Sequence, residues 1–417
     1  MIEIPQRKVL ILSASAGAGH VRAAEALLKA CVSHPAIGEV QHWDMLKYTT
    51  KLFRHLYSQV YLDLINHAPN MLGWIYDTMD TPWRNEKMRL AFEKFNAQPF
   101  LKAVTRFEPD IIFCTHFTPA ALVGWLYAAN KLTVKPAIAV TDFDCHAMWL
   151  THSYLHYFVA LEETRVHMSR LGIAADCITV SGIPIDPAFA VPLDKATARI
   201  TLNLQPDIFT ILVSAGGYGV GPVGDLIDEL LRIERRIQIV VIAGRSTELK
   251  TQLDELAASR PDGGVRLVPV GFTTEMALYM AAADLLIGKP GGLTTSEALA
   301  RSLPMCIVNP IPGQEERNSD HLLEQGAAVR CNNLPVLAWK LTNLLDHPEK
   351  LDAMREAARR IAHPSSAADI VDRVLALPPP QRDTTTEATF LRRWKSARAV
   401  ARAQRSDRKT LKKARRR

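Results

Sequence analysis

The first segment that could do chemistry is a loop of small residues ending in a histidine, Ala16–His20. It follows an apolar run, Val9–Ser15, and precedes a helix-favouring segment, Arg22–Cys31, so it reads as a turn from strand to helix. Glycines such as Gly19 let backbone amides approach a ligand, and a helix N-terminus favours negative charge. The same dipole disfavours an imidazolium. We therefore predict a neutral imidazole for His20 at pH 7, and either a structural role or a role as general base is open to it.

Three further polar residues of the first half follow apolar runs that read as buried strands. They are His116, Asp142 and His146. Ligands bind parallel sheets at the carboxyl ends of the strands, which is where these side chains should lie. These three residues are candidates to support a catalytic residue or to contact the acceptor, and a structural role is the alternative.

The second half carries two glycine-rich turns after apolar runs. The first, Ser214–Gly221, can cradle a diphosphate with its backbone amides. In the second, Gly288–Glu297, the carboxylate either caps a helix or accepts hydrogen bonds from two sugar hydroxyls. A polar loop, Pro312–Asn318, follows the next apolar run. The candidate ligand contacts in these segments are Gly216, Gly217, Gly291, Gly292, Leu293, Thr294, Glu297, Gln314, Glu315 and Asn318.

These segments need alternating strands and helices to position them. Two series of apolar runs alternate with helix-favouring sequence, and a proline-rich segment, 183–192, separates the series. The pattern predicts an α/β protein with two doubly wound, Rossmann-like domains and an active site in the cleft between them. The predicted strands are 9–15, 110–115, 137–141, 157–160, 209–214, 237–243, 265–268, 285–287 and 306–308.

The predicted domains are residues 1–192 and 193–378, followed by a tail, 379–417. Residues 43–100 of the first domain lack strand-like runs, are rich in Trp and Tyr, and place apolar residues at four-residue spacing. This insertion is either a helical subdomain with its own core or an element that contacts lipid, since Trp and Tyr suit the bilayer interface.

The net charge of +7 divides unevenly along the chain. Residues 391–417 hold thirteen Lys and Arg and one Asp, so this tail carries +12 and the remaining 390 residues carry −5. Such a tail is either a solvated extension with no partner or a segment that binds an anionic membrane surface or nucleic acid. Nucleic acid is the less favoured partner, because it would leave the glycine turns and Glu297 without a purpose.

Membrane contact should be peripheral. The best candidate for a spanning helix, 111–129, is interrupted by His116 and Pro119. The six cysteines are scattered without a Cys-x-x-Cys pair, and the chain opens without the pattern of a signal peptide. We therefore expect a cytoplasmic protein that associates with the inner face of the cell membrane.

Several of these segments together resemble one enzyme family. Ser13–Ala26 resembles its amino-terminal S-x-x-x-G-G-G-H-x-x-x-A motif, with Ala18 where a glycine is usual, and Gly288–Ala300 with Ile311–Asn318 resembles its donor-site signature. The family is that of the diacylglycerol glycosyltransferases, which comprise the monogalactosyldiacylglycerol synthases and the processive diacylglycerol glucosyltransferases. It is related to the N-acetylglucosaminyltransferase of lipid-linked peptidoglycan precursors. The resemblance covers residues 8–335 and includes the segments 141–146 and 181–186.

The resemblance implies a GT-B fold and an inverting transfer of glucose or galactose from a UDP-sugar to diacylglycerol. It assigns His20 as the base that takes the proton of the acceptor hydroxyl. It places Glu297 on the ribose hydroxyls and Phe272 beside the uracil. The residues that it places beside the diphosphate or the hexose are Gly216, Gly217, Gln314, Glu315 and Asn318.

One segment, Asp142–Asp144, matches the Asp-x-Asp metal motif of a different glycosyltransferase fold. In a GT-B protein it would lie in the acceptor domain, so we predict no required metal and no cofactor besides the UDP-sugar substrate. Helix-end amides and the glycine turn can stabilise the leaving UDP instead. The alternative activity is transfer of N-acetylglucosamine to a polyprenyl-linked precursor, against which the aromatic insertion argues.

Overall fold

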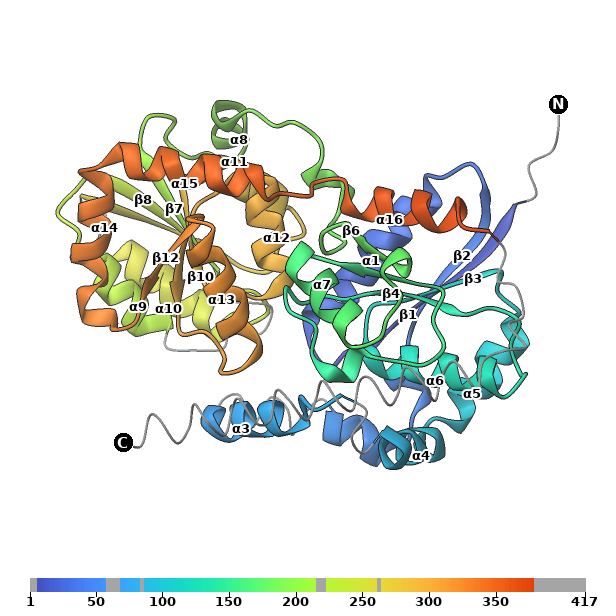
Figure 1. Ribbon diagram of the computed structural model, residues 1–417. Coiled ribbons are helices and arrows are strands. Elements are labelled where there is room, and N and C mark those ends of the chain that lie inside the picture. Colours follow the sequence, from blue (N-terminus) through green and yellow to red (C-terminus); the bar gives the residue numbers. More distant parts are fainter. Residues whose placement is uncertain (1–5, 58–67, 83–85, 215–222, 261–263, 379–417) are drawn as a thin grey trace. The chain divides into compact units, whose positions relative to one another are not determined.

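A computed structural model describes residues 6–57, 68–82, 86–214, 223–260 and 264–378 of the chain (Figure 1). The chain divides into two compact units. Of the described residues, the first unit holds those within 6–57, 70–186 and 366–378, and the second holds 68–69 and those within 187–365.

The described part of the first unit is built on a six-stranded parallel sheet in the order β2-β1-β3-β4-β5-β6. Alternate residues of β1 face opposite sides of the sheet, as expected of a strand. Val9 and Ile11 pack under α1 and α16, whereas Leu10 and Leu12 join the core that includes α5 and α6. The strands are β1 (Arg7–Ser13), β2 (Ile37–Asp44), β3 (Ile111–Cys114), β4 (Pro136–Ala139), β5 (His156–Val159) and β6 (Ile178–Val180); the helices are α1 (Ala18–Val32), α3 (Pro69–Met79), α4 (Glu86–Asn96), α5 (Gln98–Phe107), α6 (Phe117–Ala128), α7 (Glu162–Arg170) and α16 (Ser366–Leu375), with 3₁₀ turns η1 (Met45–Tyr48), η2 (Ala147–Trp149) and η3 (Ala175–Cys177).

The second unit repeats this architecture with the strand order β12-β11-β10-β7-β8-β9, again all parallel within the described residues. Every residue of β8 is buried, the pattern of a strand covered on both faces. Its strands are β7 (Phe209–Ser214), β8 (Ile237–Ile242), β9 (Val265–Val270), β10 (Leu285–Gly288), β11 (Met305–Val308) and β12 (Ala328–Cys331); its helices are α8 (Lys195–Thr201), α9 (Val223–Leu230), α10 (Thr247–Ala258), α11 (Met276–Ala282), α12 (Gly292–Ala300), α13 (Gln314–Glu324), α14 (Leu337–Leu345) and α15 (Pro348–Arg360), with 3₁₀ turns η4 (Pro187–Phe189) and η5 (Leu334–Val336).

The two doubly wound parallel sheets confirm the predicted fold class, but three strands were not predicted. These are β2, β6 and β12, and each is the edge strand of its sheet. Edge strands are covered less completely, so β2 mixes polar and apolar residues and β6 has only three residues. The long apolar runs that revealed the inner strands are missing there.

The C-terminal helix α16 belongs to the first unit, whereas the sequence assigned residues 193–378 to the second domain. Figure 1 shows α16 beside α1, and Ile370 and Val374 are buried in the core under both helices. The Ser366 hydroxyl donates to the Ile183 carbonyl at 2.7 Å. An amphipathic pattern reveals that a helix has a buried face but not which sheet it covers.

The insertion at 43–100 is helical after its first two residues, which end β2, as far as the structure describes it. Residues 51–57 form a further helical segment, in addition to η1, α3, α4 and α5. Phe53 and Phe100 are buried in the same core as β1 and α6, so the insertion extends the core of the first unit. Within the described residues, no helix combines the length and the apolar character that crossing a membrane requires.

Candidate active site

His20 lies in the first turn of α1, where two strand ends hold its ring. Its Nδ1 is 3.0 Å from the Thr115 carbonyl oxygen and 2.8 Å from the Thr141 hydroxyl. A carbonyl oxygen only accepts, so the contact with Thr115 favours the tautomer with the proton on Nδ1 and the lone pair on Nε2. The Thr115 hydroxyl also donates to the His20 carbonyl at 2.8 Å, which fixes the start of the helix. His20 therefore presents Nε2 as a proton acceptor.

The electrostatics of His20 suit a general base. Burial lowers its pKa to about 4, and the hydrogen bond to the Thr115 carbonyl opposes the shift in part. The sequence predicted a neutral His20 from the helix dipole, but desolvation is the dominant cause. The imidazole is consequently neutral throughout the physiological pH range.

His116 and Asp142 lie in the same cluster as His20. The His116 ring meets the His20 ring edge-on at 4.6 Å between centroids, and Trp149 lies 6.2 Å from His20. The Trp149 indole donates to Asp142 Oδ2 at 3.3 Å. The sheet thus brings all three predicted catalytic residues together, and Trp149 contacts each of them.

His116 has a structural task within this cluster. It is the N-cap of α6, and its Nδ1 accepts from the Thr118 backbone N–H at 3.1 Å. Burial, the nearby His20 and the Arg89 guanidinium hold the pKa of His116 well below its ordinary value. With Nδ1 engaged by the backbone, the His116 ring packs edge-on against the His20 ring.

The Asp-x-Asp pattern does not form a single site. Asp142 accepts from Trp149, whereas Asp144 accepts from the Cys145 backbone N–H at 2.8 Å. His146 caps η2 and its Nε2 contacts the Tyr76 carbonyl at 3.0 Å. In the ranges that the structure describes, no three His, Cys, Asp or Glu side chains gather as metal ligands would.

The second unit places its glycine turn at the carboxyl edge of its sheet. Gly288 pairs with Ser214, and a Cβ at Gly288 would come within 3.2 Å of the Ser214 carbonyl oxygen, so this close approach favours glycine. Asn318 Nδ2 donates to the Pro290 carbonyl at 2.9 Å and fixes the turn before α12. The other predicted glycines, Gly216 and Gly217, lie outside the described residues.

Glu297 is buried on α12, in its second turn. The first turn of α12 contains no acidic residue, so the alternative of a capping carboxylate is wrong. Gly291 is the N-cap, Gly292 and Leu293 are buried, and Thr294 is half-buried. The helix N-terminus therefore faces the glycine turn with its backbone amides, as anion binding requires.

Glu315 supports the neighbouring loop. Its Oε2 accepts from the Ile311 backbone N–H at 2.7 Å, and a Cβ built on Gly291 would lie 3.7 Å from its Oε1. Burial raises the pKa of Glu315. Gln314 begins α13 after Gly313, whose φ of 94° lies in the region that favours glycine. The two loops that carry the predicted donor contacts thus lie side by side.

Phe272 follows β9 at the same edge and is 60% exposed. The Arg245 guanidinium, which follows β8, lies 5.2 Å from its ring centroid. An exposed aromatic face of this kind can stack on a nucleobase. Phe272 stays a predicted contact of the uracil. Sequence reasoning did not single out Arg245, Thr115 or Thr141 as site residues, although both threonines closely follow strands.

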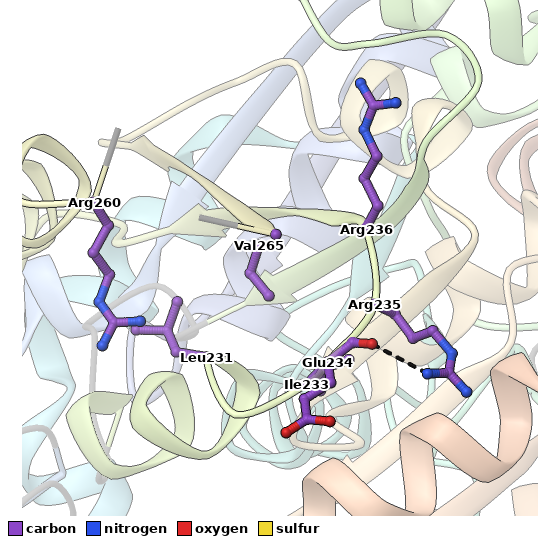
Figure 2. A pocket seen from close by; sticks show the side chains of 8 residues that line it. Leu231, Ile233, Glu234, Arg235, Arg236, Arg260 and Val265 are labelled. Atoms are coloured by element: carbon purple, nitrogen blue, oxygen red, sulfur yellow. Dashed lines mark hydrogen bonds between the residues drawn. The ribbon is translucent and has the colours of Figure 1, made fainter. Parts of the chain in front are cut away.

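A hollow of about 490 Å³ lies at the opposite edge of this sheet, before the amino ends of β8 and β9. In Figure 2 the guanidinium groups of Arg235, Arg236 and Arg260 point in different directions, and Arg235 donates to the Glu234 carbonyl. The arginine side chains that line the hollow do not converge on one point where a ligand could bind. The glycine turn before α12 lies at the carboxyl edge of the sheet, so the hollow does not coincide with the predicted donor contacts of that turn.

Comparison with known proteins agrees with this geometry. Residues 20–185 match the family model of monogalactosyldiacylglycerol (MGDG) synthases, and residues 211–374 match that of the glycosyltransferase family 28 C-terminal domain. The processive diacylglycerol beta-glucosyltransferase of Staphylococcus aureus strain MRSA252 is 30% identical over 324 residues, which is 77% of this chain and 80% of the relative. The same enzyme of strain JH9 is 31% identical over the same shares.

Solved structures share the fold. MurG of Acinetobacter baumannii has a TM-score of 0.57 at 15% identity, covering 89% of this chain and all of that chain. Anabaena HepE in complex with UDP has a TM-score of 0.52 at 14% identity over the same shares. These likenesses and the two parallel six-stranded sheets of the described residues define a GT-B protein.

Sequence identity to known enzymes shows which family of the GT-B fold this chain belongs to. The chain belongs to the family of diacylglycerol glycosyltransferases and is a hexosyltransferase of glycolipid synthesis. The resemblance of its motifs to that family is therefore confirmed.

Proposed function

We propose that the protein transfers a hexose from a UDP-sugar to the free hydroxyl of diacylglycerol, with inversion and with His20 as the base. Nε2 of His20 takes the proton of the acceptor hydroxyl as its oxygen attacks C1 of the sugar. The bond between C1 and the UDP oxygen breaks, and its electron pair leaves with UDP. The observation that carries the proposal is the 3.0 Å distance between His20 Nδ1 and the Thr115 carbonyl oxygen. A proton on Nδ1 satisfies this carbonyl and leaves Nε2 as the basic nitrogen.

The donor is proposed to bind at the carboxyl edge of the second sheet. HepE was solved with UDP-glucose and S. aureus MnaA with UDP, and both share this fold. Glu297 would accept the ribose hydroxyls, and Phe272 would lie against the uracil. The N-terminus of α12 supplies backbone amides to the diphosphate, which favours departure of UDP without a metal ion. The names of the curated relatives favour glucose over galactose.

The enzyme is proposed to work peripherally at the inner face of the cell membrane. Trp and Phe side chains that remain in water favour insertion into a bilayer surface. The basic residues 391–417, which lie outside the described residues, would add attraction to anionic lipid. The large apolar residues exposed on the helical insertion are Leu52, Leu56, Met71, Trp74, Met79, Met88, Phe92 and Phe95.

The transfer is tested with purified protein, radiolabelled UDP-glucose or UDP-galactose, and diacylglycerol in detergent micelles, with and without EDTA. We expect a β-glycosyldiacylglycerol at equal rates in both buffers. Complete loss in EDTA that Mn²⁺ restores would overturn the metal-free proposal. A product made only with UDP-N-acetylglucosamine and a polyprenyl-linked acceptor would overturn the lipid assignment.

Membrane binding is tested by sedimentation with anionic vesicles at low and high salt. Deleting 391–417 should remove the salt-sensitive part of binding, because screening shortens the reach of its charges. Replacing Trp74, Met88 and Phe95 together by Ser should remove the salt-resistant part. Trp339→Ser in the second unit, which removes a side chain of similar exposure, is the matched control. Unchanged binding of both variants would place the membrane contact elsewhere.

A further inference from the structure

A buried ion pair on α4 is connected to the catalytic cluster through the Phe117 ring and is only partly hydrogen-bonded. Glu93 is fully buried, and its Oε1 accepts from the Tyr57 hydroxyl at 3.2 Å. Arg89, one turn earlier, has a side chain that is 18% exposed. Its Nε lies 3.9 Å from Glu93 Oε1, which is an ionic contact but too long for a hydrogen bond.

Several polar atoms of this pair have no partner within the described residues. Nε and Nη1 of Arg89 and Oε2 of Glu93 are buried and make no hydrogen bond there. Buried charges cost several kcal/mol unless further hydrogen bonds satisfy them, and native proteins rarely leave such groups unmet. Keeping two N–H donors of Arg89 buried without hydrogen bonds lowers the stability of the folded protein. A ligand that accepts from these donors would offset this loss.

The contacts of Arg89 indicate where that ligand would bind. Its guanidinium lies 5.8 Å from the ring centroid of Phe117. Phe117 packs on His116 at 4.0 Å, and His116 packs on His20 at 4.6 Å between centroids. Arg89 is also near enough for its charge to lower the pKa of His116. Two rings, those of Phe117 and His116, thus connect the donors of Arg89 to the base that receives the acceptor hydroxyl in the proposed reaction.

We propose that Arg89 is a specificity-determining residue that donates hydrogen bonds to an ester carbonyl of the diacylglycerol acceptor. The inference rests on the function proposed above. Diacylglycerol has a single hydroxyl, which must lie at His20, and its remaining polar groups are esters whose carbonyl oxygens only accept. A guanidinium with unused donors is complementary to them, and it is charged at every physiological pH. Glu93, held by Tyr57, orients Arg89 from the side away from water.

The test compares two acceptors, 1,2-dioleoylglycerol and its ether analogue 1,2-dioleylglycerol, which lacks both carbonyls. The wild-type enzyme should prefer the ester about 10–100-fold in kcat/KM, the scale of a hydrogen bond to a charged donor. Arg89→Met should lose this preference by slowing the ester reaction alone, and Arg89→Lys should keep part of it. Affinity for UDP should not change in either variant. Lys87→Met, an exposed cation of the same helix, is the matched control.

The possible outcomes are distinct. Equal use of ester and ether by the wild-type enzyme would overturn the inference, whether or not any variant folds. An equal fall for both acceptors in Arg89→Met would show that Arg89 only supports the fold. Transfer to neither acceptor by the wild-type protein would instead overturn the proposed function.

Discussion

The low pKa of His20 predicts an unusual pH dependence of catalysis. If His20 is the base, the kcat/KM profile should fall on the acid side with an apparent pKa of about 4. At pH 5 about 90% of such a base is neutral, whereas an imidazole with the ordinary pKa of 6.5 would be only about 3% neutral. Activity at pH 5 should therefore remain close to its value at pH 7.

The assay is initial transfer of labelled hexose between pH 4.5 and 8, with intrinsic fluorescence as a check that the protein stays folded. His20→Ala should lower kcat by ~10²–10⁴-fold across the range with little effect on UDP affinity. His55→Ala, which removes an exposed histidine, is the control. An acid limb near pH 6.5, or near-normal turnover of His20→Ala, would refute the assignment and direct attention to Asp142.

Four other substitutions test the description of the site. Glu297→Ala should weaken UDP binding by about 2–3 kcal/mol in calorimetry, while an unchanged affinity would exclude the ribose contact. Thr141→Val removes the hydroxyl near His20 Nδ1 and should lower kcat about 2–10-fold, with the Thr115 carbonyl still in place. Gly288→Ala should destabilise the second unit by about 1–3 kcal/mol in urea unfolding, because its Cβ would crowd the Ser214 carbonyl. Burial raises the pKa of Glu93 to about 7, so the folded protein is most stable when this carboxyl is protonated. The stability that protonated Glu93 provides is complete below pH 4.5 and is lost as the pH rises to 7. Glu93→Gln should therefore have a larger free energy of unfolding than wild type by about 3 kcal/mol at pH 8 and by less than about 1 kcal/mol at pH 5.

Much of the fold could be predicted from the sequence because buried parallel strands are continuous apolar runs. Runs such as those of β1 and β8 are covered on both faces, so burial alone reveals them. Edge strands such as β2 and β12 lack this signature. The assignment of α16 to the first unit was beyond prediction, since its apolar face fits either sheet in principle.

Only the local features of the site could be predicted from the sequence, because the others depend on contacts between distant segments. His20 stood out because a glycine loop follows a strand, but its tautomer depends on the Thr115 carbonyl, which is 95 residues away in sequence. The role of Arg89 depends on the packing of α4 against Phe117, and nothing local distinguishes it from an exposed arginine. Motifs thus reveal ligand-binding loops, whereas hydrogen-bond partners emerge only from tertiary structure.

The return of the chain at Ser366 gives the enzyme the topology of an inserted domain. The Ile185 backbone N–H donates to the Ser366 hydroxyl at 3.2 Å, so the points where the chain leaves and re-enters the first unit adjoin. Residues 187–365 are therefore a cassette whose two ends meet, which is the arrangement that tolerates exchange between relatives. The corresponding unit of a relative could be grafted at these two points. A truncation before Ser366, by contrast, would remove α16 and uncover the apolar face of the unit that holds His20.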